Sequence, residues 1–408
     1  MLGNVMVGQS GGPTSVINSS LAGIFKTAKD SGCGIVYGMR NGIEGLLDDR
    51  YIDLSEYIKN DLDIELLKRT PSSFLGTCRY KLPTPEVAPE TYDKIFKILK
   101  KLDVKYFFYI GGNDSMDTIM QLSKYARSID SDVAFMGVPK TIDNDLACTD
   151  HTPGYGSAAK YIATAMKEII RDAKTYPNDS VTIVEIMGRN AGWLTCASSL
   201  SKAEDCGGPD LIYLPERTFS HTKFLSDIKE LKREKRNLII AVSEGVKTSN
   251  GKYVCEANKT STVTDAFGHK LLGGTALYLS DFLTENTGLK SRGIVLSTLQ
   301  RCASHLVSRR DITEAFMAGA DAMVAAIKGI SGKMIVFKRI SDAPYSIITD
   351  ICDIEKIANK EKCVPDSYIS ENGTGVNAAF DMYARPLIIG ELSPFMVDGL
   401  PRHLFIDK

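Results

Sequence analysis

The chain has 408 residues and a mass of 44.6 kDa. Because this is about three times the commonest domain size, we expect two or three packed lobes. With 43% hydrophobic and 24% charged residues, the composition is that of an ordinary globular protein and excludes disordered, collagen-like and disulfide-scaffold classes. Since 49 Lys and Arg nearly balance 50 Asp and Glu, we expect neither nucleic acid nor a membrane as a partner, and any anionic ligand needs a local site.

The cysteines and the first residues predict where the protein works. Nine cysteines without a C-x-x-C pair are typical of neither a disulfide framework nor a structural zinc site, and they indicate a reducing compartment. The N-terminus carries no basic stretch of a signal peptide, and no apolar run approaches the roughly 18 residues of a membrane span. We therefore expect a cytoplasmic protein.

Short apolar runs alternate with helical periodicity along most of the chain. This alternation is typical of βα units wound on a largely parallel sheet, so we predict an α/β fold. The clearest predicted helix covers residues 158–175, where Ile162, Met166 and Ile169 share one face, and a second covers residues 92–102. The predicted strands are short and rich in β-branched or aromatic residues; they cover residues 5–7, 105–110, 133–138, 181–186, 238–242 and 293–296.

Two glycine pairs directly follow predicted strands. Gly11 and Gly12 precede a predicted helix, so backbone N–H groups and the helix N-terminus could meet a phosphate there. No Lys stands at the position that a Walker A loop requires, which excludes the usual nucleotide-hydrolase site. Gly111 and Gly112 repeat the pattern after residues 105–110. Because such turns meet at the carboxyl edge of a doubly wound sheet, we expect both pairs to line one ligand site.

Polar residues beside these turns suit phosphoryl chemistry. Asn113 and Asp114 would supply oxygen ligands for a magnesium ion carried with phosphates, or, alternatively, they cap the next helix. After residues 133–138, Asp143 and Asp145 stand two residues apart with Lys140 close by, a constellation suited to proton abstraction next to a charged phosphoryl group. No glycine and distal glutamate follow at the spacing of a calcium-binding EF-hand.

The later strands also end in charged groups. Arg189 suits a phosphate or transition-state charge, Glu244 can accept sugar hydroxyls, and Arg301 can hold a sugar phosphate. Residues 154–159 match a loose dinucleotide pattern, but no strand precedes them, so we expect a tight helix start and not the cofactor site of an oxidoreductase. The charged run 229–236 predicts a solvated helix face. The five histidines show no metal-ligand spacing, and we expect each to be a surface or capped residue and not a metal ligand.

The motifs together resemble one family, the phosphofructokinases. The resemblance runs from residue 1 to about residue 325, in the family's own order, through GQSGGPTS, VYGMRNGIEGLL, FLGTCR, GGNDS, PKTIDND, TPGYGSA, MGRNAG, SEG and LQR. It implies an α/β fold of two doubly wound, mostly parallel sheet lobes with the active site between them. We expect a phosphoryl-donor lobe over residues 1–140, a sugar-phosphate lobe over 141–290, and a segment over 291–408 that crosses both lobes and ends in an extension without a readable motif.

The resemblance also implies an activity and a set of roles. The expected reaction transfers a phosphoryl group to the 1-hydroxyl of fructose 6-phosphate in glycolysis, with Mg²⁺ as the cofactor. The implied catalytic residues are Asp143 as the general base, Arg189, Lys140 and Asp114, and the implied donor-binding residues are Gly11, Gly12, Gly112 and Lys140. The implied metal ligands are Asn113, Asp114 and Asp145. The implied sugar-phosphate ligands are Thr141, Ile142, Asp143, Met187, Gly188, Arg189, Glu244, Arg292, Thr298 and Arg301. Because the position of Arg292 often serves a neighbouring subunit in this family, we expect a homodimer or homotetramer.

Two positions bear on the phosphoryl donor. Asp114 and Lys140 replace small residues of the ATP-using bacterial enzymes and resemble the pyrophosphate-dependent branch. A carboxylate at Asp114 would repel and exclude the α-phosphate of a nucleotide, and Lys140 would add a positive charge for pyrophosphate. We therefore predict a reversible, pyrophosphate-dependent enzyme. The alternatives are an ATP-dependent or mixed-donor 6-phosphofructokinase and a non-catalytic regulatory subunit, against which the intact Asp143, Asp145 and Arg189 argue.

Overall fold

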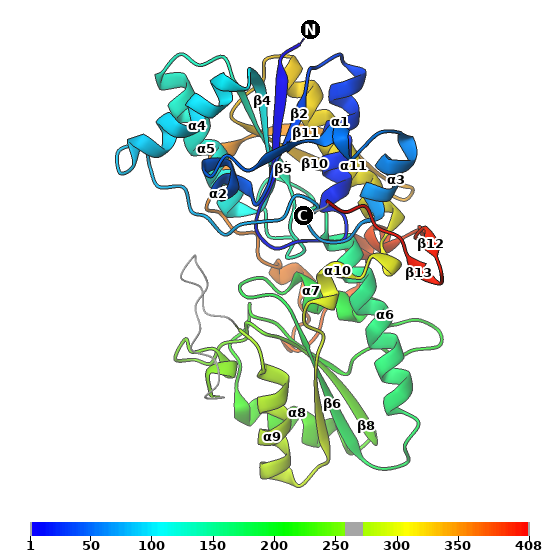
Figure 1. The fold of residues 1–408 in the computed structure, drawn as a ribbon. Coiled ribbons are helices and arrows are strands. Elements are labelled where there is room, and N and C mark those ends of the chain that lie inside the picture. The colour runs from blue at the N-terminus through cyan, green and yellow to red at the C-terminus, as the bar shows by residue number, and fades with distance from the viewer. Residues whose placement is uncertain (1, 258–271, 407–408) are drawn as a thin grey trace.

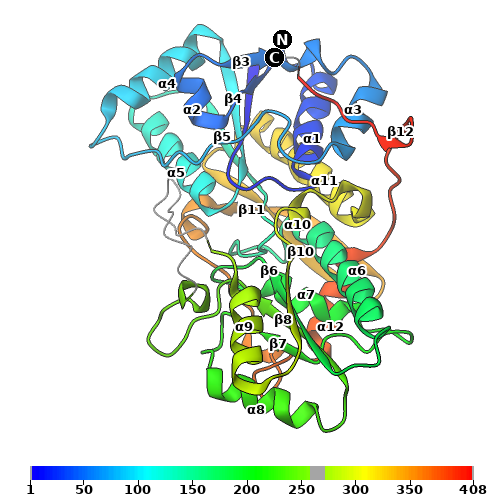
Figure 2. The same ribbon diagram turned by 60° about the horizontal axis from the view of Figure 1, so that its bottom comes forward.

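The computed structural model describes residues 2–257 and 272–406. Figure 1 shows two lobes, one above the other, each built around its own sheet, and Figure 2 shows the same division after a turn of 60°. We call them the first lobe, which contains the N-terminus, and the second lobe.

The first lobe contains a seven-stranded sheet in the order β11-β10-β5-β4-β1-β2-β3. Its five inner strands pair in parallel, and the two edge strands, β3 and β11, are antiparallel to their neighbours. The strands are β1 (Asn4–Gln9), β2 (Val36–Met39), β3 (Tyr51–Asp53), β4 (Val104–Gly111), β5 (Ala134–Pro139), β10 (Lys333–Asp342) and β11 (Tyr345–Asp353).

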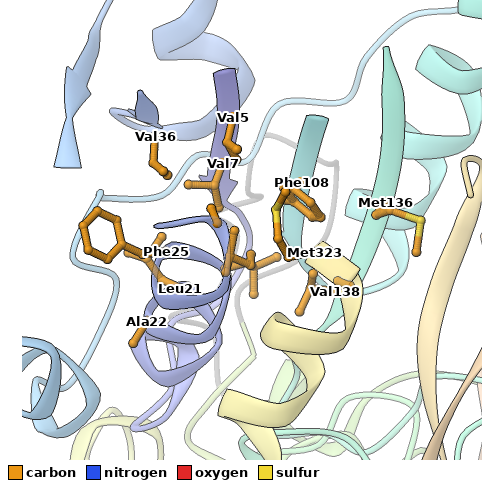
Figure 3. Close-up of a cluster of buried hydrophobic side chains, with 14 of the residues drawn as sticks. Val5, Val7, Leu21, Ala22, Phe25, Val36, Phe108, Met136, Val138 and Met323 are labelled. Atoms are coloured by element: carbon orange, nitrogen blue, oxygen red, sulfur yellow. The ribbon is translucent and has the colours of Figure 1, made fainter. Parts of the chain in front are cut away.

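Helices cover both faces of this sheet because its strands alternate apolar side chains to both sides. Val5 and Val7 of β1 pack with Leu21 and Met323, whereas Met6 joins the core on the opposite face (Figure 3). Burying one such aliphatic side chain contributes roughly 1.5–3 kcal/mol. One face is covered by α1 (Ile17–Asp30), α3 (Asp61–Arg69) and α11 (Arg309–Ile327), and the other by α2 (Gly42–Leu47), α4 (Pro89–Lys101) and α5 (Asn113–Ser128).

The second lobe repeats this plan on a smaller, all-parallel sheet in the order β7-β8-β6-β9. The strands are β6 (Ser180–Ile186), β7 (Leu211–Tyr213), β8 (Asn237–Ser243) and β9 (Ser291–Val295). One face packs against α6 (Tyr155–Ala173), α7 (Trp193–Ala197) and α12 (Ala378–Ala384), and the other against α8 (His221–Leu231) and α9 (Thr275–Thr287). The short helix α10 (Leu299–Cys302) follows β9 near the junction of the lobes (Figures 1 and 2).

The C-terminal part of the chain ties the two lobes together. After β9, helix α11 and strands β10 and β11 return to the first lobe, and Phe380 and Leu387 then enter the core of the second lobe. The hairpin β12 (Met396–Val397) and β13 (Leu400–Pro401) leads back, and the backbone N–H of Leu404 donates to Thr70 Oγ1 at 2.9 Å in the first lobe. The segment for which we found no motif is therefore structural in both lobes.

The predicted fold class is confirmed. All six predicted strands are present, and the two predicted helices correspond to α6 and α4, each of which begins three residues before its predicted start. Pro89 explains the earlier start of α4, because proline is well accommodated in the first turn of a helix. Within the described ranges, no helix is both long and apolar enough to cross a membrane.

Candidate active site

Parallel pairing brings the predicted turns to one edge of each sheet. In the first lobe β1, β4 and β5 are neighbours, with Gln9 opposite Ile110 and Gly111 opposite Pro139. The glycine turns and residues 140–145 therefore start side by side. In the second lobe Ile186 pairs with Ser243, so the turns that hold Arg189 and Glu244 are also adjacent.

Lys140 lies buried between the glycine turns. The residue is only 2% exposed, its backbone N–H donates to Gly111 O at 3.1 Å, and its Nζ donates to Gly12 O at 2.6 Å. A Cβ on Gly11, whose φ is +74°, would lie 3.4 Å from Lys140 Nζ. The small turn residues thus leave room for an anion in front of the ammonium group.

Burial lowers the pKa of Lys140 to about 8, although Asp143 and Asp145 favour its charged form. The guanidinium groups of Arg301 and Arg79 oppose that charge and lower the pKa further. The charges of Arg301 and Arg79 therefore act on the same ammonium group. The FLGTCR motif contains Arg79, but its residues alone gave no reason to place it beside Lys140.

The turn after β5 carries the two carboxylates. The backbone N–H of Asp143 donates to Thr141 Oγ1 at 3.0 Å, and Asn144 between the carboxylates is left-handed with φ +55°. Burial raises the pKa of Asp143, while Lys140 and Arg189 lower it. Burial and the charge of Asp143 raise the pKa of Asp145 to about 7. The pair is thus held where at least one carboxylate can accept a proton near neutral pH.

Asn113 lies beside Asp145 and offers an oxygen atom to a cation. Its Nδ2 donates to Asp145 Oδ2 at 3.5 Å, while its Oδ1 is buried without a hydrogen-bond partner. Helix α5 begins with Gly112 as its N-cap, so Asn113 and Asp114 lie in its first turn and not at the N-cap position. Among the described residues no cluster of three His, Cys, Asp or Glu side chains is arranged for a metal ion. An oxygen pair that is completed by ligand phosphates fits Mg²⁺, which normally keeps water and phosphate ligands.

The second lobe contributes Glu244 and Arg189. The backbone N–H of Gly188 donates to Glu244 Oε1 at 3.3 Å, and burial raises the pKa of Glu244 to about 7. The charges of Asp143 and Arg189 also act on this carboxyl group. A Cβ on Gly245 would lie 1.9 Å from Arg189 O, which explains the glycine of the SEG motif.

Arg301 joins the two lobes at the site. A Cβ on Gly12 would lie 3.5 Å from Arg301 Nη1, and Arg301 also lowers the pKa of Asp143. Its Nε is buried without a hydrogen-bond partner. Gln300, next in the chain, accepts the backbone N–H of Met187 at 3.0 Å. The LQR motif thus orders the MGR turn and places a cation close to Gly12 and Asp143.

Three predicted residues do not gather with the others. Arg292 lies in β9 opposite Thr182, is 61% exposed, and approaches Asp172 at 3.9 Å. Thr298 is exposed at the start of α10, and its carbonyl accepts the N–H of Arg301 at 3.1 Å. Ile142 is buried in the apolar core of the second lobe.

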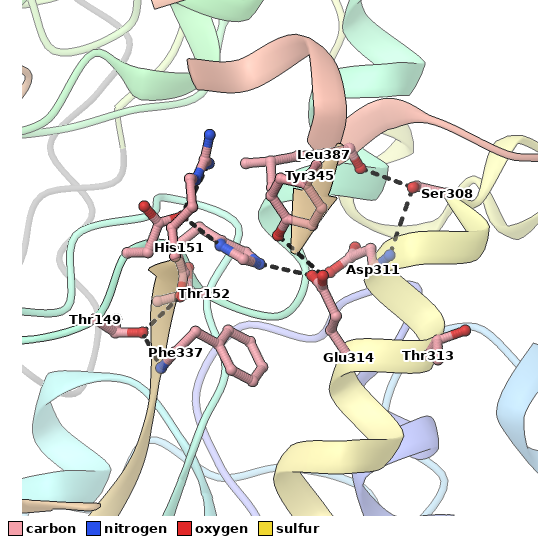
Figure 4. A network of polar contacts seen from close by, with 12 residues as sticks. Thr149, His151, Thr152, Ser308, Asp311, Thr313, Glu314, Phe337, Tyr345 and Leu387 are labelled. Atoms are coloured by element: carbon pink, nitrogen blue, oxygen red, sulfur yellow. Dashed lines mark hydrogen bonds and ion pairs between the residues drawn. The ribbon is translucent and has the colours of Figure 1, made fainter. Parts of the chain in front are cut away.

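His151 is not at the surface, and carboxylates cap both of its ring nitrogens. This ring is 1% exposed and lies between Asp150 Oδ2 at 2.8 Å and Glu314 Oε2 at 2.7 Å (Figure 4). Burial alone would lower the pKa of His151, but the hydrogen bonds to the two carboxylates raise it to about 9. Tyr345 of β11 donates to Glu314 Oε1 at 2.9 Å, so the network links the first lobe to the loop after Asp145. His269 lies outside the described residues.

Residues 361 and 362 are site neighbours that no motif indicated. The backbone N–H of Lys362 donates to Asp145 O at 2.7 Å. Asn190 Nδ2 donates to the carboxylate of Glu361 at 2.9 Å, and the charge of Glu361 raises the pKa of both Asp143 and Asp145. The C-terminal extension therefore contacts the candidate site directly.

Two lobes that gather lysine, arginine and carboxylate side chains at facing strand ends are typical of α/β enzymes that act on phosphorylated compounds. A family model described as Phosphofructokinase matches residues 4–326. The chain therefore belongs to the phosphofructokinase family.

Several relatives match over nearly the whole chain. The pyrophosphate–fructose 6-phosphate 1-phosphotransferase of Halomonas elongata is 36% identical over 403 residues, which cover 98% of this chain and 95% of that protein. The protein of the same name from Xanthomonas campestris pv. campestris is 38% identical over 405 residues, with 98% and 96% covered. The crystal structure of the pyrophosphate-dependent phosphofructokinase from Nitrosospira multiformis superposes with a TM-score of 0.88 at 35% identity and covers 98% of this chain and 95% of that one.

Proposed function

We propose that the protein transfers a phosphoryl group from pyrophosphate to the 1-hydroxyl of fructose 6-phosphate, giving fructose 1,6-bisphosphate and phosphate in glycolysis. The observation that carries the choice of donor is Lys140, whose buried ammonium group lies against Gly12 O at 2.6 Å. The relatives from Halomonas and Xanthomonas, which carry the corresponding name, support the same choice.

Asp143 is the proposed general base. It takes the proton of the 1-hydroxyl, whose oxygen then attacks the nearer phosphorus of pyrophosphate in line with the leaving phosphate. Lys140, Arg189 and the backbone N–H of Gly12 stabilise the negative charge of the transferred and leaving groups, whereas the N–H of Gly11 donates to Cys78 O at 3.2 Å. Because pyrophosphate and a phosphate ester have comparable transfer potentials in this scheme, the reaction runs in both directions.

The sugar phosphate lies on the second-lobe side in this proposal. Glu244 accepts hydrogen bonds from the sugar hydroxyls, and Arg301 holds the sugar phosphate close to the Asp143 carboxylate. Met187 and Gly188 contribute backbone groups, while Thr141 holds the N–H of Asp143 at 3.0 Å and so orders the turn that faces the sugar.

Asn113 and Asp145 are the proposed protein ligands of Mg²⁺, with Asp114 nearby. The unpartnered Oδ1 of Asn113 supports this assignment. A bound Mg²⁺ would neutralise phosphate charge. The chain's own contribution is to hold two oxygen-bearing side chains from the ends of β4 and β5 next to each other.

A second copy of the chain is the proposed partner. Arg292 is exposed on β9 and pairs with Asp172, and the apolar side chains of Leu277, Val295 and Leu299 on α9, β9 and α10 are also exposed. A two-fold pairing at β9 would deliver Arg292 to the neighbour's sugar phosphate. Light scattering gives the oligomeric state, and mixing Arg292→Ala with Asp143→Asn subunits is expected to restore about a quarter of the normal activity if the site is shared.

The test supplies fructose 6-phosphate and Mg²⁺ with either pyrophosphate or ATP and measures fructose 1,6-bisphosphate under matched conditions. Product with pyrophosphate alone supports the donor assignment, and product with ATP alone contradicts it while leaving the acceptor chemistry in place. No product with either donor, in a folded preparation, favours the non-catalytic alternative.

A further inference from the structure

Asn144 stands between the two carboxylates of the candidate site, but its own side chain bonds to other parts of the protein. It is fully buried with 0% exposure, and its φ of +55° makes the tight turn between Asp143 and Asp145. Its Oδ1 accepts the backbone N–H of Thr152 at 3.0 Å, and its Nδ2 donates to the hydroxyl of Tyr383 at 2.8 Å. Both ends of the amide are therefore used to fix the turn to its surroundings.

Tyr383 comes from α12, in the extension that follows the family motifs. Its hydroxyl accepts from Asn144 and donates to Asp150 O at 2.8 Å, so it spans both ends of the loop that starts at the catalytic turn. The ring is stacked on Tyr368 with centroids 5.6 Å apart, and the Arg339 guanidinium lies 4.8 Å from the ring centroid. Arg339 Nη2 also donates to Tyr383 O at 3.0 Å, so both ring and backbone are held.

Lys362 holds the same loop from the other side. Its Nζ donates to Thr149 O at 3.0 Å and to Asp150 O at 2.9 Å, and its backbone N–H donates to Asp145 O at 2.7 Å. Residues 143–151 belong to no helix or strand, so no regular hydrogen-bond ladder fixes them. Their position depends on side chains that arrive from other parts of the chain.

We propose that Tyr383 is a positioning residue for phosphoryl transfer, which sets the place of the Asp143 carboxylate through the amide of Asn144. This role rests on the proposed function of Asp143 as the general base. A base contributes fully only within hydrogen-bond reach of the proton that it takes, and a displacement of about 1 Å costs as much as about 10²-fold in rate.

The test replaces Tyr383 by phenylalanine, which removes one oxygen atom and keeps the ring. We expect kcat to fall by about 10- to 100-fold, while KM for fructose 6-phosphate and for pyrophosphate stays within about twofold. Tyr368→Phe is the matched control, because this ring belongs to the same aromatic cluster and its hydroxyl makes no hydrogen bond to any residue in the described ranges. Its kcat is expected to be normal, and the thermal midpoints of both variants are to be compared with that of the parent.

A double-mutant cycle separates positioning from general loss of stability. Asn144→Gly removes the amide and tolerates the left-handed φ. If Tyr383 acts through Asn144, Tyr383→Phe causes no further loss of kcat in that background, whereas losses that multiply would overturn the role. Normal kcat in Tyr383→Phe alone would also overturn it.

The Asp143→Asn variant distinguishes a failure of the proposed base role of Asp143 from a failure of the positioning role of Tyr383. If this variant keeps normal turnover, Asp143 is not the base and the proposed function of this residue falls. If Asp143→Asn is inactive but Tyr383→Phe is normal, only the positioning role is wrong.

Discussion

Lys140 offers the sharpest test of how the donor site works. Burial lowers its pKa from 10.5 to about 8, which means that the protein disfavours the charged ammonium by about 3 kcal/mol. The negative charge of a bound pyrophosphate would compensate for this cost of keeping the ammonium charged. Lys140→Met keeps most of the side-chain volume but removes the charge, and loss of one preorganised donor at a charge-bearing oxygen is expected to lower kcat by about 10²–10³-fold.

The assay is kcat/KM for pyrophosphate as a function of pH, at saturating fructose 6-phosphate. Because the ammonium is charged below a pKa of about 8, the parent enzyme is expected to lose activity above that pH by up to about tenfold per unit. The ionisation of pyrophosphate itself affects parent and variant alike, so the informative quantity is their ratio. This ratio is expected to be largest at neutral pH and to shrink as the medium becomes alkaline.

Lys124→Met provides the control. Lys124 lies in α5 of the same lobe, half exposed, and its Nζ pairs with Glu355 at 3.0 Å. Its loss is expected to leave the pH profile unchanged, because an exposed ion pair contributes about 1 kcal/mol or less. If the ratio of parent to Lys140→Met activity is independent of pH across the alkaline range, titration of Lys140 does not control donor use and the reasoning is refuted.

Three other changes follow from the site. Asp143→Asn is expected to lower kcat by about 10²–10⁴-fold with little change in fructose 6-phosphate affinity, measured by calorimetry, and preserved turnover would exclude the base role. Asp114→Gly combined with Lys140→Gly is expected to raise the ATP-to-pyrophosphate activity ratio, and an unchanged ratio would separate these residues from donor choice. The raised pKa of His151, about 9 against 6.5, means that up to about 3 kcal/mol of stability is present below pH 6.5 and is lost as pH rises through about 9. The free energy of unfolding, measured with urea at several pH values across this window, is expected to change less with pH in Glu314→Gln than in the parent. Equal slopes against pH would contradict the assignment.

Periodicity and turn composition predicted the central strands because these are buried on both faces and their apolar runs are continuous. They did not predict β10 and β11, although these strands complete the first sheet. The exposed side chains of Ile340, Ile348 and Ile351 make this pair look unlike a buried parallel strand. The boundaries of the expected domains stay a prediction. Within the predicted segment 291–408, β9 joins the second sheet and β10 joins the first.

The candidate site was predictable where its charged residues directly follow a strand in the sequence. Lys140, Asp143 and Asp145 lie directly after β5, so the geometry of a parallel sheet alone places them at its carboxyl edge. Tyr383 and His151 could not be found in this way. Tyr383 bonds to Asn144 across 239 positions of the chain, and His151 bonds to Glu314 across 163, and no local pattern encodes such a pair.

The perturbed groups of the site share one physical origin. Burial raises the pKa of Asp145 and of Glu244 to about 7 and lowers that of Lys140 to about 8, so carboxyl and amino groups alike resist their charged forms. In the proposed function, Lys140 meets the opposite charge of a phosphate, and Asp145 beside Asn113 meets that of a cation. Pyrophosphate favours the ammonium, and a cation favours the carboxylate. The charge of Asp145 favours the ammonium form of Lys140. In the proposed function, binding of pyrophosphate at Lys140 and binding of a cation at Asp145 are therefore expected to reinforce one another.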